Sequence, residues 1–401
     1  MIKYKVDDIN KMIFHWPWAG YSGNYFFDGI MDCHPELLTI KEFGLSAYGL
    51  IYKEILSGKD IENGIRLIDY PQTDEQKALI EDEFDVLFRK SHFCTCDPIV
   101  PSRERFFDEL REALEGKTVP SKLEWFKAMF LAYNYALGRT FNIPPAIFFN
   151  MHPMKVSVVE CKKEMLDIYD QFEELKIVSV LRSQLSELGS VMQCEAKLHD
   201  EPFDFLKYVE IAINRTALYC SESDKWYKNR GVIRFEDLKL FPKETMISLC
   251  DFLGINYNDS MLRVTVNGVD NGYTYAGTNT LGWSIKPVYD LHANYIGSLD
   301  LYRLELLKGK YYEPWGYKAK LYNGKKYTFE EINKLYSLPF TCESFLSSKE
   351  QAELNKQGHE RLESFLEYVH KNNLWEAVNG KNGKKPVIWL KPKVDDEELF
   401  H

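Results

Sequence analysis

A loop close to the N-terminus combines the residue types that bind a phosphate group. The apolar run Met12–Phe14 predicts a strand, and residues 17–24, Pro-Trp-Ala-Gly-Tyr-Ser-Gly-Asn, predict a tight turn that leads into a helix. Gly20, Ser22 and Gly23 allow the backbone to turn sharply, so that several N–H groups and the positive end of the helix face one anion. Because an ordinary strand-to-helix connection also favours Gly and Ser, the loop alone leaves both interpretations open.

An arginine stands directly after another predicted strand. The β-branched run 176–181 predicts this strand, Arg182 follows it, and Ser190 comes eight residues later on the next predicted helix. A guanidinium offers a planar pair of donors to a phosphate, and a hydroxyl near a helix start adds a neutral donor. Taken singly, Arg182 also suits a surface ion pair and Ser190 a helix cap. Their spacing behind an apolar strand favours phosphate binding.

A histidine stands at the end of a third predicted strand. Residues 145–151 are apolar and bounded by prolines, and His152 follows them. Neutral imidazole is the natural general base near pH 7, and an attacking hydroxyl needs a base because the free group is a poor nucleophile. A histidine beside a proline is also an ordinary strand-end residue, so both readings of His152 stay open.

The elements that must position these residues alternate between strands and helices. This alternation predicts an α/β fold with a mainly parallel central sheet, helices on both faces and a likeness to P-loop NTPases. Ligands of such sheets bind beyond the carboxyl ends of the strands, where Ser22, His152 and Arg182 are all expected. The expected strands are 12–14, 145–151, 176–181 and 231–235. The first helix is expected to end at Leu37. Further helices are expected over 41–56, 76–93, 102–114, 121–137, 159–174, 203–220, 242–253, 288–307, 328–335 and 349–373.

The distribution of helices predicts how the chain is organised. Residues 1–320 are expected to form an α/β domain with a helical insertion at about 60–140, because several helical patterns follow one another there with no strand between them. Residues 321–401 are expected to form a C-terminal helical extension packed on this domain, with a flexible tail. The stretch 263–283 is rich in Gly, Asn, Thr and Tyr and predicts an ordered binding loop or a lid.

Composition narrows the classes of partner. The chain has 401 residues, 45% of them hydrophobic, and a formal net charge of −10 at pH 7, which argues against a nucleic-acid-binding surface but permits a local basic pocket for a small anion. No apolar run is long enough for a transmembrane segment, and acidic residues occupy the place of a signal sequence, so we expect a cytoplasmic protein. The eight cysteines are scattered, and we expect reduced thiols and no metal.

Three separated segments together resemble a known family. They are the first loop, Val178–Arg182 with Ser190, and Arg234-Phe235-Glu236-Asp237-Leu238 followed by Pro242 and Phe252-Leu253-Gly254. Their types and order are similar to those of sulfotransferases that use 3′-phosphoadenosine 5′-phosphosulfate (PAPS), over roughly Met12 to Leu262. The chain is identified as a divergent member by this resemblance, and its co-substrate is then expected to be PAPS.

The resemblance implies a role for each matched residue. The first loop would bind the 5′-phosphosulfate, Arg182 and Ser190 would hold the 3′-phosphate, and Phe235 would lie near the adenine in place of a common tyrosine. His152 would remove the acceptor proton, and Gly282 belongs to a segment, 277–286, that is faintly similar to the family's late glycine-rich nucleotide loop. The loop residues implied are Gly20, Tyr21, Ser22, Gly23, Asn24 and Tyr25.

The first loop departs from the family at a position that matters for catalysis. Sulfotransferases usually carry a Lys or Arg there, and the stretch from Ile13 to Cys33 contains neither. Charge that develops on the leaving oxygen must then be stabilised by backbone N–H groups, by His15, by Lys155 or by Lys286, or else activity is weak or lost.

Three functions are therefore compatible with the sequence. The first is a sulfotransferase that acts on a hydroxyl or amine of an unidentified acceptor, and a carbohydrate is one candidate acceptor. We expect the acceptor to bind at the helical insertion. The second is a catalytically inactive nucleotide-binding or scaffold protein of the same fold. The third, an ATP-dependent small-molecule kinase, would need G-x-x-x-x-G-K-[ST], which the first loop lacks.

Overall fold

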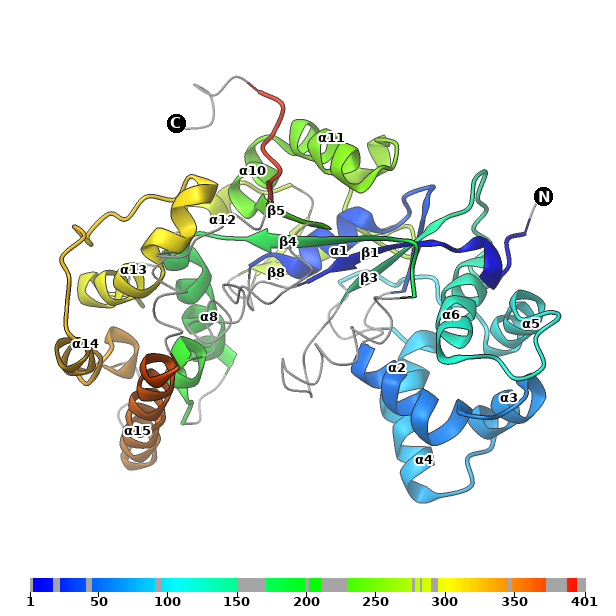
Figure 1. Cartoon of the computed structure of the whole chain (residues 1–401), viewed down its shortest axis with the longest axis horizontal. Coiled ribbons are helices and arrows are strands. Elements are labelled where there is room, and N and C mark those ends of the chain that lie inside the picture. The colour runs from blue at the N-terminus through cyan, green and yellow to red at the C-terminus, as the bar shows by residue number, and fades with distance from the viewer. Residues whose placement is uncertain are drawn as a thin grey trace.

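Six parallel strands form the centre of the molecule, in the order β10-β5-β4-β1-β3-β2 (Figure 1). They are β1 (Lys11–His15), β2 (Leu37–Thr39), β3 (Ala146–Asn150), β4 (Glu174–Leu181), β5 (Arg230–Arg234) and β10 (Ile388–Trp389). The computed structural model describes residues 3–16, 22–40, 45–90, 95–150, 171–198, 202–210, 229–275, 278–281, 283–289, 295–344, 348–372 and 388–394. The strand order and direction confirm the expected α/β fold.

Strand β1 lies where the chain reverses its direction across the sheet. From β1 the chain continues to β2 and β3 on one side, and then crosses to β4, β5 and β10 on the other. In a parallel sheet, such a reversal leaves a crevice at the carboxyl ends of the strands, and ligands bind there. The carboxyl end of β1 is His15, and α1 begins at Asn24.

The two faces of the sheet are covered by separate apolar cores, because side chains alternate along each strand. Met12 and Phe14 of β1 belong to one core, which also contains Trp125 and Phe126 from α6 (Lys122–Ala136). Ile13 belongs to the other core. This second core is formed with helices α1 (Asn24–Met31), α10 (Phe235–Leu240) and α11 (Pro242–Leu253).

A group of helices lies at one end of the molecule, and another lies at the opposite end (Figure 1). The first group is α2 (Leu45–Ile51), α3 (Ile61–Asp69), α4 (Asp74–Leu79), α5 (Arg103–Ala113) and α6. The second is α8 (Gln184–Leu198), α13 (Ser298–Tyr312), α14 (Phe329–Tyr336) and α15 (Lys349–Lys371). Leu188 and Met192 of α8 pack with Leu362 and Leu366 of α15 in a third apolar cluster, so α8 connects the sheet with the C-terminal helices.

Several predicted boundaries are wrong. The first helix was expected to end at Leu37, but Leu37 begins β2 and the helix α1 ends at Met31. The helix expected over 159–174 lies mostly outside the described ranges, and its expected end is wrong, because Glu174 is the first residue of β4. The helix expected over 76–93 is divided: α4 ends at Leu79, a π-helical turn follows at Ile80–Phe84, and a 3-10 turn at Asp85–Phe88.

The stretch 263–283 contains regular structure that its composition did not predict. It forms two antiparallel hairpins, β6 (Thr265–Val266) with β7 (Val269–Asp270), and β8 (Gly272–Tyr275) with β9 (Thr278–Leu281). The first hairpin lies against α1. None of the helices within the described ranges combines the length and the apolar character that crossing a lipid bilayer requires.

Candidate functional site

The first helix begins at a glycine in the left-handed backbone region. Gly23 caps α1 with φ +93°, a conformation that residues with a Cβ rarely adopt. Phe26, Phe27, Ile30 and Met31 are buried and form the apolar stripe that makes this segment a helix. The first turn carries no acidic side chain, so no carboxylate there offsets the positive end of the helix dipole. Ser22 is buried, and its hydroxyl lies 3.3 Å from Asn24 Oδ1.

The ring of Phe235 lies against this glycine. A Cβ placed on Gly23 would stand 2.4 Å from Phe235 Cδ2, so the ring and the glycine backbone are in direct contact. Phe235 is the first residue of α10 and follows β5, whereas Gly23 follows β1. The loop and the Arg-Phe-Glu-Asp-Leu motif therefore meet, although more than two hundred residues separate them in the sequence.

Arg182 reaches the same ring from the end of β4. Its Cζ lies 4.8 Å from the centroid of the Phe235 ring, and its guanidinium donates to Ser190 Oγ and to the Pro287 carbonyl, both at 2.8 Å. The side chain is 3% exposed. The expected proximity of Arg182, Ser190 and the glycine turn is thus present, although their expected role as a phosphate site stays a prediction.

The residues after Phe235 hold Arg182 in place. Glu236 accepts from the backbone N–H of Ser183 at 3.0 Å and from the hydroxyl of Tyr317, which also donates to the Leu181 carbonyl. These bonds fix the backbone on either side of Arg182, and they give Glu236 a positioning function within the motif.

The flanking residues Arg234 and Asp237 form a buried ion pair, with Nε 2.9 Å from Oδ2. Trp389 of β10 donates to the same carboxylate at 3.1 Å. This pair fastens the start of α10 to the sheet, and with it the ring of Phe235.

A lysine that was not among the expected site residues lies beside Arg182. Lys239 follows Phe235 by one helical turn, and its Nζ is 3.3 Å from the centroid of the Phe26 ring. Burial, and to a smaller extent the charge of Arg182, lower the pKa of Lys239 to about 7. Its spacing of four residues from Phe235 is the signal that could have identified it, since residues four apart share a helix face.

His15, at the carboxyl end of β1, forms a second buried polar group. Its Nδ1 lies 2.7 Å from Asp28 Oδ1 on α1, and Asn150 at the end of β3 donates to the other oxygen of Asp28. His15 Nε2 is buried and makes no hydrogen bond within the described ranges. His15, one of the groups considered for stabilising developing charge, is therefore held by a carboxylate at the strand end.

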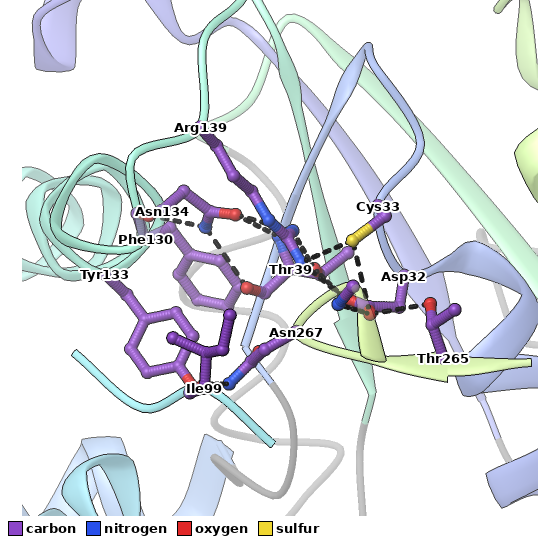
Figure 2. Close-up of polar contacts among 11 residues, drawn as sticks. Asp32, Cys33, Thr39, Ile99, Phe130, Tyr133, Asn134, Arg139, Thr265 and Asn267 are labelled. Atoms are coloured by element: carbon purple, nitrogen blue, oxygen red, sulfur yellow. Dashed lines mark hydrogen bonds and ion pairs between the residues drawn. The ribbon is translucent and has the colours of Figure 1, made fainter. Parts of the chain in front are cut away.

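The opposite end of α1 is fixed by the polar network shown in Figure 2. Asp32 forms an ion pair with Arg139 at 2.6 Å and accepts from the hydroxyls of Thr39 and Thr265 at 3.1 and 2.8 Å. Although burial acts to raise it, the Arg139 guanidinium holds the pKa of Asp32 below its ordinary value. The network joins α1, β2, the segment after α6 and the β6–β7 hairpin.

Four expected site residues lie outside the described ranges, together with one of the cations considered for the loop. The four are Gly20, Tyr21, His152 and Gly282, and the cation is Lys155. Tyr25, on the first turn of α1, is half-buried, and Lys286 is an exposed residue at the start of α12 (Lys286–Tyr289). No cluster of three or more His, Cys, Asp or Glu side chains suited to a metal occurs in the part of the chain that the structure describes.

Comparisons with solved structures return sulfotransferase domains. One is the sulfotransferase domain from the curacin biosynthetic pathway, at 14% identity and a TM-score of 0.37, covering 72% of this chain and 90% of that domain. Another is the sulfotransferase domain from the Synechococcus PCC 7002 olefin synthase, at 13% identity and a TM-score of 0.38, covering 73% and 89%. No protein-family model and no curated protein sequence matches. At such low TM-scores the similarity says nothing about the nucleotide or the acceptor.

Proposed function

We propose that this chain is a PAPS-dependent sulfotransferase. The observation that carries the proposal is the meeting of three segments around the Phe235 ring: the Gly23 turn after β1, Arg182 after β4, and α10 after β5. All three follow the carboxyl ends of strands of one parallel sheet, and β1, where the strand order reverses, is one of these strands. This arrangement supports a bound nucleotide with two separate anionic groups more than a surface ion pair, because Arg182 is buried.

The proposed roles follow from the donors at each position. The N–H groups at the start of α1 and the Ser22 hydroxyl face the 5′-phosphosulfate, and Arg182 with Ser190 holds the 3′-phosphate. The acceptor oxygen or nitrogen forms a bond to sulfur while the bond from sulfur to the 5′-phosphate oxygen breaks. His152 takes the acceptor proton, and 3′-phosphoadenosine 5′-phosphate leaves with the electron pair of the broken bond.

The second candidate is a protein that binds the nucleotide without catalysis. It is favoured by the absence of any Lys or Arg from Ile13 to Cys33, which removes the usual cation from the leaving oxygen. Release of the desulfated nucleotide in the presence of an acceptor separates the two functions, since only the enzyme produces it.

The proposal is tested by nucleotide binding. We expect 3′-phosphoadenosine 5′-phosphate to raise the melting temperature of the protein, and ATP and ADP to raise it less, because they lack the 3′-phosphate. Arg182→Ala should abolish this shift. Arg182→Lys, which keeps a cation but loses the planar pair of donors, should weaken binding less.

Two variants serve as references for Arg182→Ala. Arg263→Ala removes an exposed guanidinium paired with Asp270 and should leave the shift unchanged. His152→Ala should bind the nucleotide normally and lose turnover. Binding of 3′-phosphoadenosine 5′-phosphate by folded Arg182→Ala as tightly as by the wild type would overturn the assignment.

A further inference from the structure

Lys239 occupies an environment that is unusual for a lysine. Its side chain is 2% exposed, and its Nζ lies among three aromatic rings from three segments. The distances from Nζ to the ring centroids are 3.3 Å for Phe26, 5.6 Å for Phe235 and 5.8 Å for Trp283. Aromatic faces attract an ammonium group but compensate only part of the free energy that is lost when it leaves water.

A second buried cation shares one of these rings. Arg182 lies over the Phe235 ring at 4.8 Å and Lys239 lies over it at 5.6 Å, so both charges are held within contact of one phenyl group. Two like charges in a medium of low dielectric constant repel each other, and this repulsion contributes to the low pKa of Lys239. A bound anion would remove the repulsion and stabilise both charges.

Both cations contact rings at the N-terminus of α1. Phe26, the ring nearest to Lys239, belongs to the first turn of α1, and the Phe235 ring touches Gly23 at the cap of the same helix. Lys239 contacts rings from α1, α10 and the segment before α12, and the charge of Arg182 acts on it as well. Three sources of positive potential therefore converge, in a chain whose formal net charge is −10.

We propose that Lys239 is the second cation of the nucleotide site, where it binds a phosphate group of the nucleotide and adds a positive charge to a site whose first loop carries neither Lys nor Arg. The proposal rests on the proposed function, since a phosphate-bearing nucleotide is the anion. It has a thermodynamic consequence: a phosphate stabilises the charged ammonium, so binding takes up a proton near neutral pH.

The test is calorimetric titration of 3′-phosphoadenosine 5′-phosphate into the intact protein, in buffers with different ionisation enthalpies. For the wild type we expect net proton uptake at about pH 8 and little at about pH 5, because Lys239 is already charged at the lower pH. Lys239→Met should bind about 10- to 100-fold more weakly and show no uptake. Lys239→Arg, always charged, should bind without the uptake.

Lys243→Met removes an exposed lysine from the neighbouring helix α11 and should change neither affinity nor uptake. Titrations with 3′-AMP and with 5′-AMP identify the phosphate that Lys239 binds, since Lys239→Met should weaken binding only of the nucleotide that carries this phosphate. An unchanged affinity and uptake in Lys239→Met, while Arg182→Ala loses binding, overturns the assignment of Lys239 alone. Absence of nucleotide binding by the wild-type protein overturns the proposed function itself.

Discussion

At the scale of single residues, a glycine is needed at position 23 for two reasons. Its φ of +93° is the left-handed conformation that starts α1, and its missing Cβ leaves the space that the Phe235 ring fills. We predict that Gly23→Ala destabilises the protein by about 3 kcal/mol through strain and overlap, and that it abolishes nucleotide binding. Urea unfolding and nucleotide-induced thermal shifts measure the two effects.

Gly116→Ala separates the two causes. Gly116 has nearly the same φ, +87°, but a Cβ there meets nothing within 4 Å. Its substitution should cost only the backbone strain, about 1 kcal/mol, and should leave nucleotide binding intact. Equal losses of stability in the two variants would show that the contact between ring and glycine is unimportant.

The sequence indicated some residues near the candidate site and missed Lys239, for a physical reason. Arg182 directly follows an apolar run and Ser190 comes eight residues later, so their spacing predicted their proximity. Phe235 was expected only from the resemblance of its motif to that of a known family. Lys239 lies inside a helix, and its burial depends on rings contributed by α1 and by the segment before α12. A basic residue on a helix is expected to be solvent-exposed when its packing partners are unknown.

At the scale of elements, α1 is held by two carboxylates, the half-buried Asp28 within the helix and the buried Asp32 at its C-cap. Asp28 binds His15 and Asn150 at the strand ends, and Asp32 binds Arg139 in the network of Figure 2. Since the N-terminus of α1 carries the proposed anion site, these contacts determine how rigidly that site is held. The network around Asp32 also contains the backbone N–H of Gly268, which donates to it at 3.0 Å.

We predict that Asp32→Ala destabilises the protein by about 3–5 kcal/mol, because it leaves the buried Arg139 charge without its carboxylate. The pKa of Asp32 is lowered in the folded state, so its contribution is complete above about pH 4 and is lost as the pH falls through the folded-state pKa. Urea unfolding at about pH 7 and about pH 3 should therefore show a smaller difference between wild type and variant in acid.

Asp108→Ala is the control for a surface carboxylate. Asp108 pairs with Arg111 at 3.2 Å, and its side chain is 70% exposed. Its removal should change the free energy of unfolding by less than about 1 kcal/mol at either pH. A loss for Asp32→Ala no larger than for Asp108→Ala would contradict a structural role for the network.

Short strands limited what could be predicted about the elements. Strands β1, β3, β4 and β5 were expected because each is an apolar run long enough to recognise. Strands β2 and β10 were missed, since they have three and two residues and pair only because β3 and β5 present free edges. The hairpins of 265–281 were missed for a similar reason: residues such as Gly, Asn and Thr predict a loop when the partner strand is unknown.

At the scale of the whole molecule, distant parts of the chain converge on the helices of the candidate site. The C-terminal helices pack on α8, the helix that carries Ser190, through the third apolar cluster. The last described strand, β10, joins the sheet beside β5 and contacts the start of α10. The proposed nucleotide site is thus supported by segments from both ends of the sequence, and the expected division at residue 320 stays a prediction.

This convergence predicts that a residue close to the C-terminus affects nucleotide binding. Trp389 donates to Asp237 at 3.1 Å, and its ring lies 4.7 Å from the Arg234 guanidinium, so it stabilises the ion pair that fastens α10 and hence Phe235 and Lys239. Trp389→Ala should cost about 2–4 kcal/mol in urea unfolding and weaken binding of 3′-phosphoadenosine 5′-phosphate about tenfold. Ile388→Ala, at the neighbouring position with 53% exposure, should change both by little. If Trp389→Ala lost stability but kept full affinity, β10 would support the sheet without positioning α10.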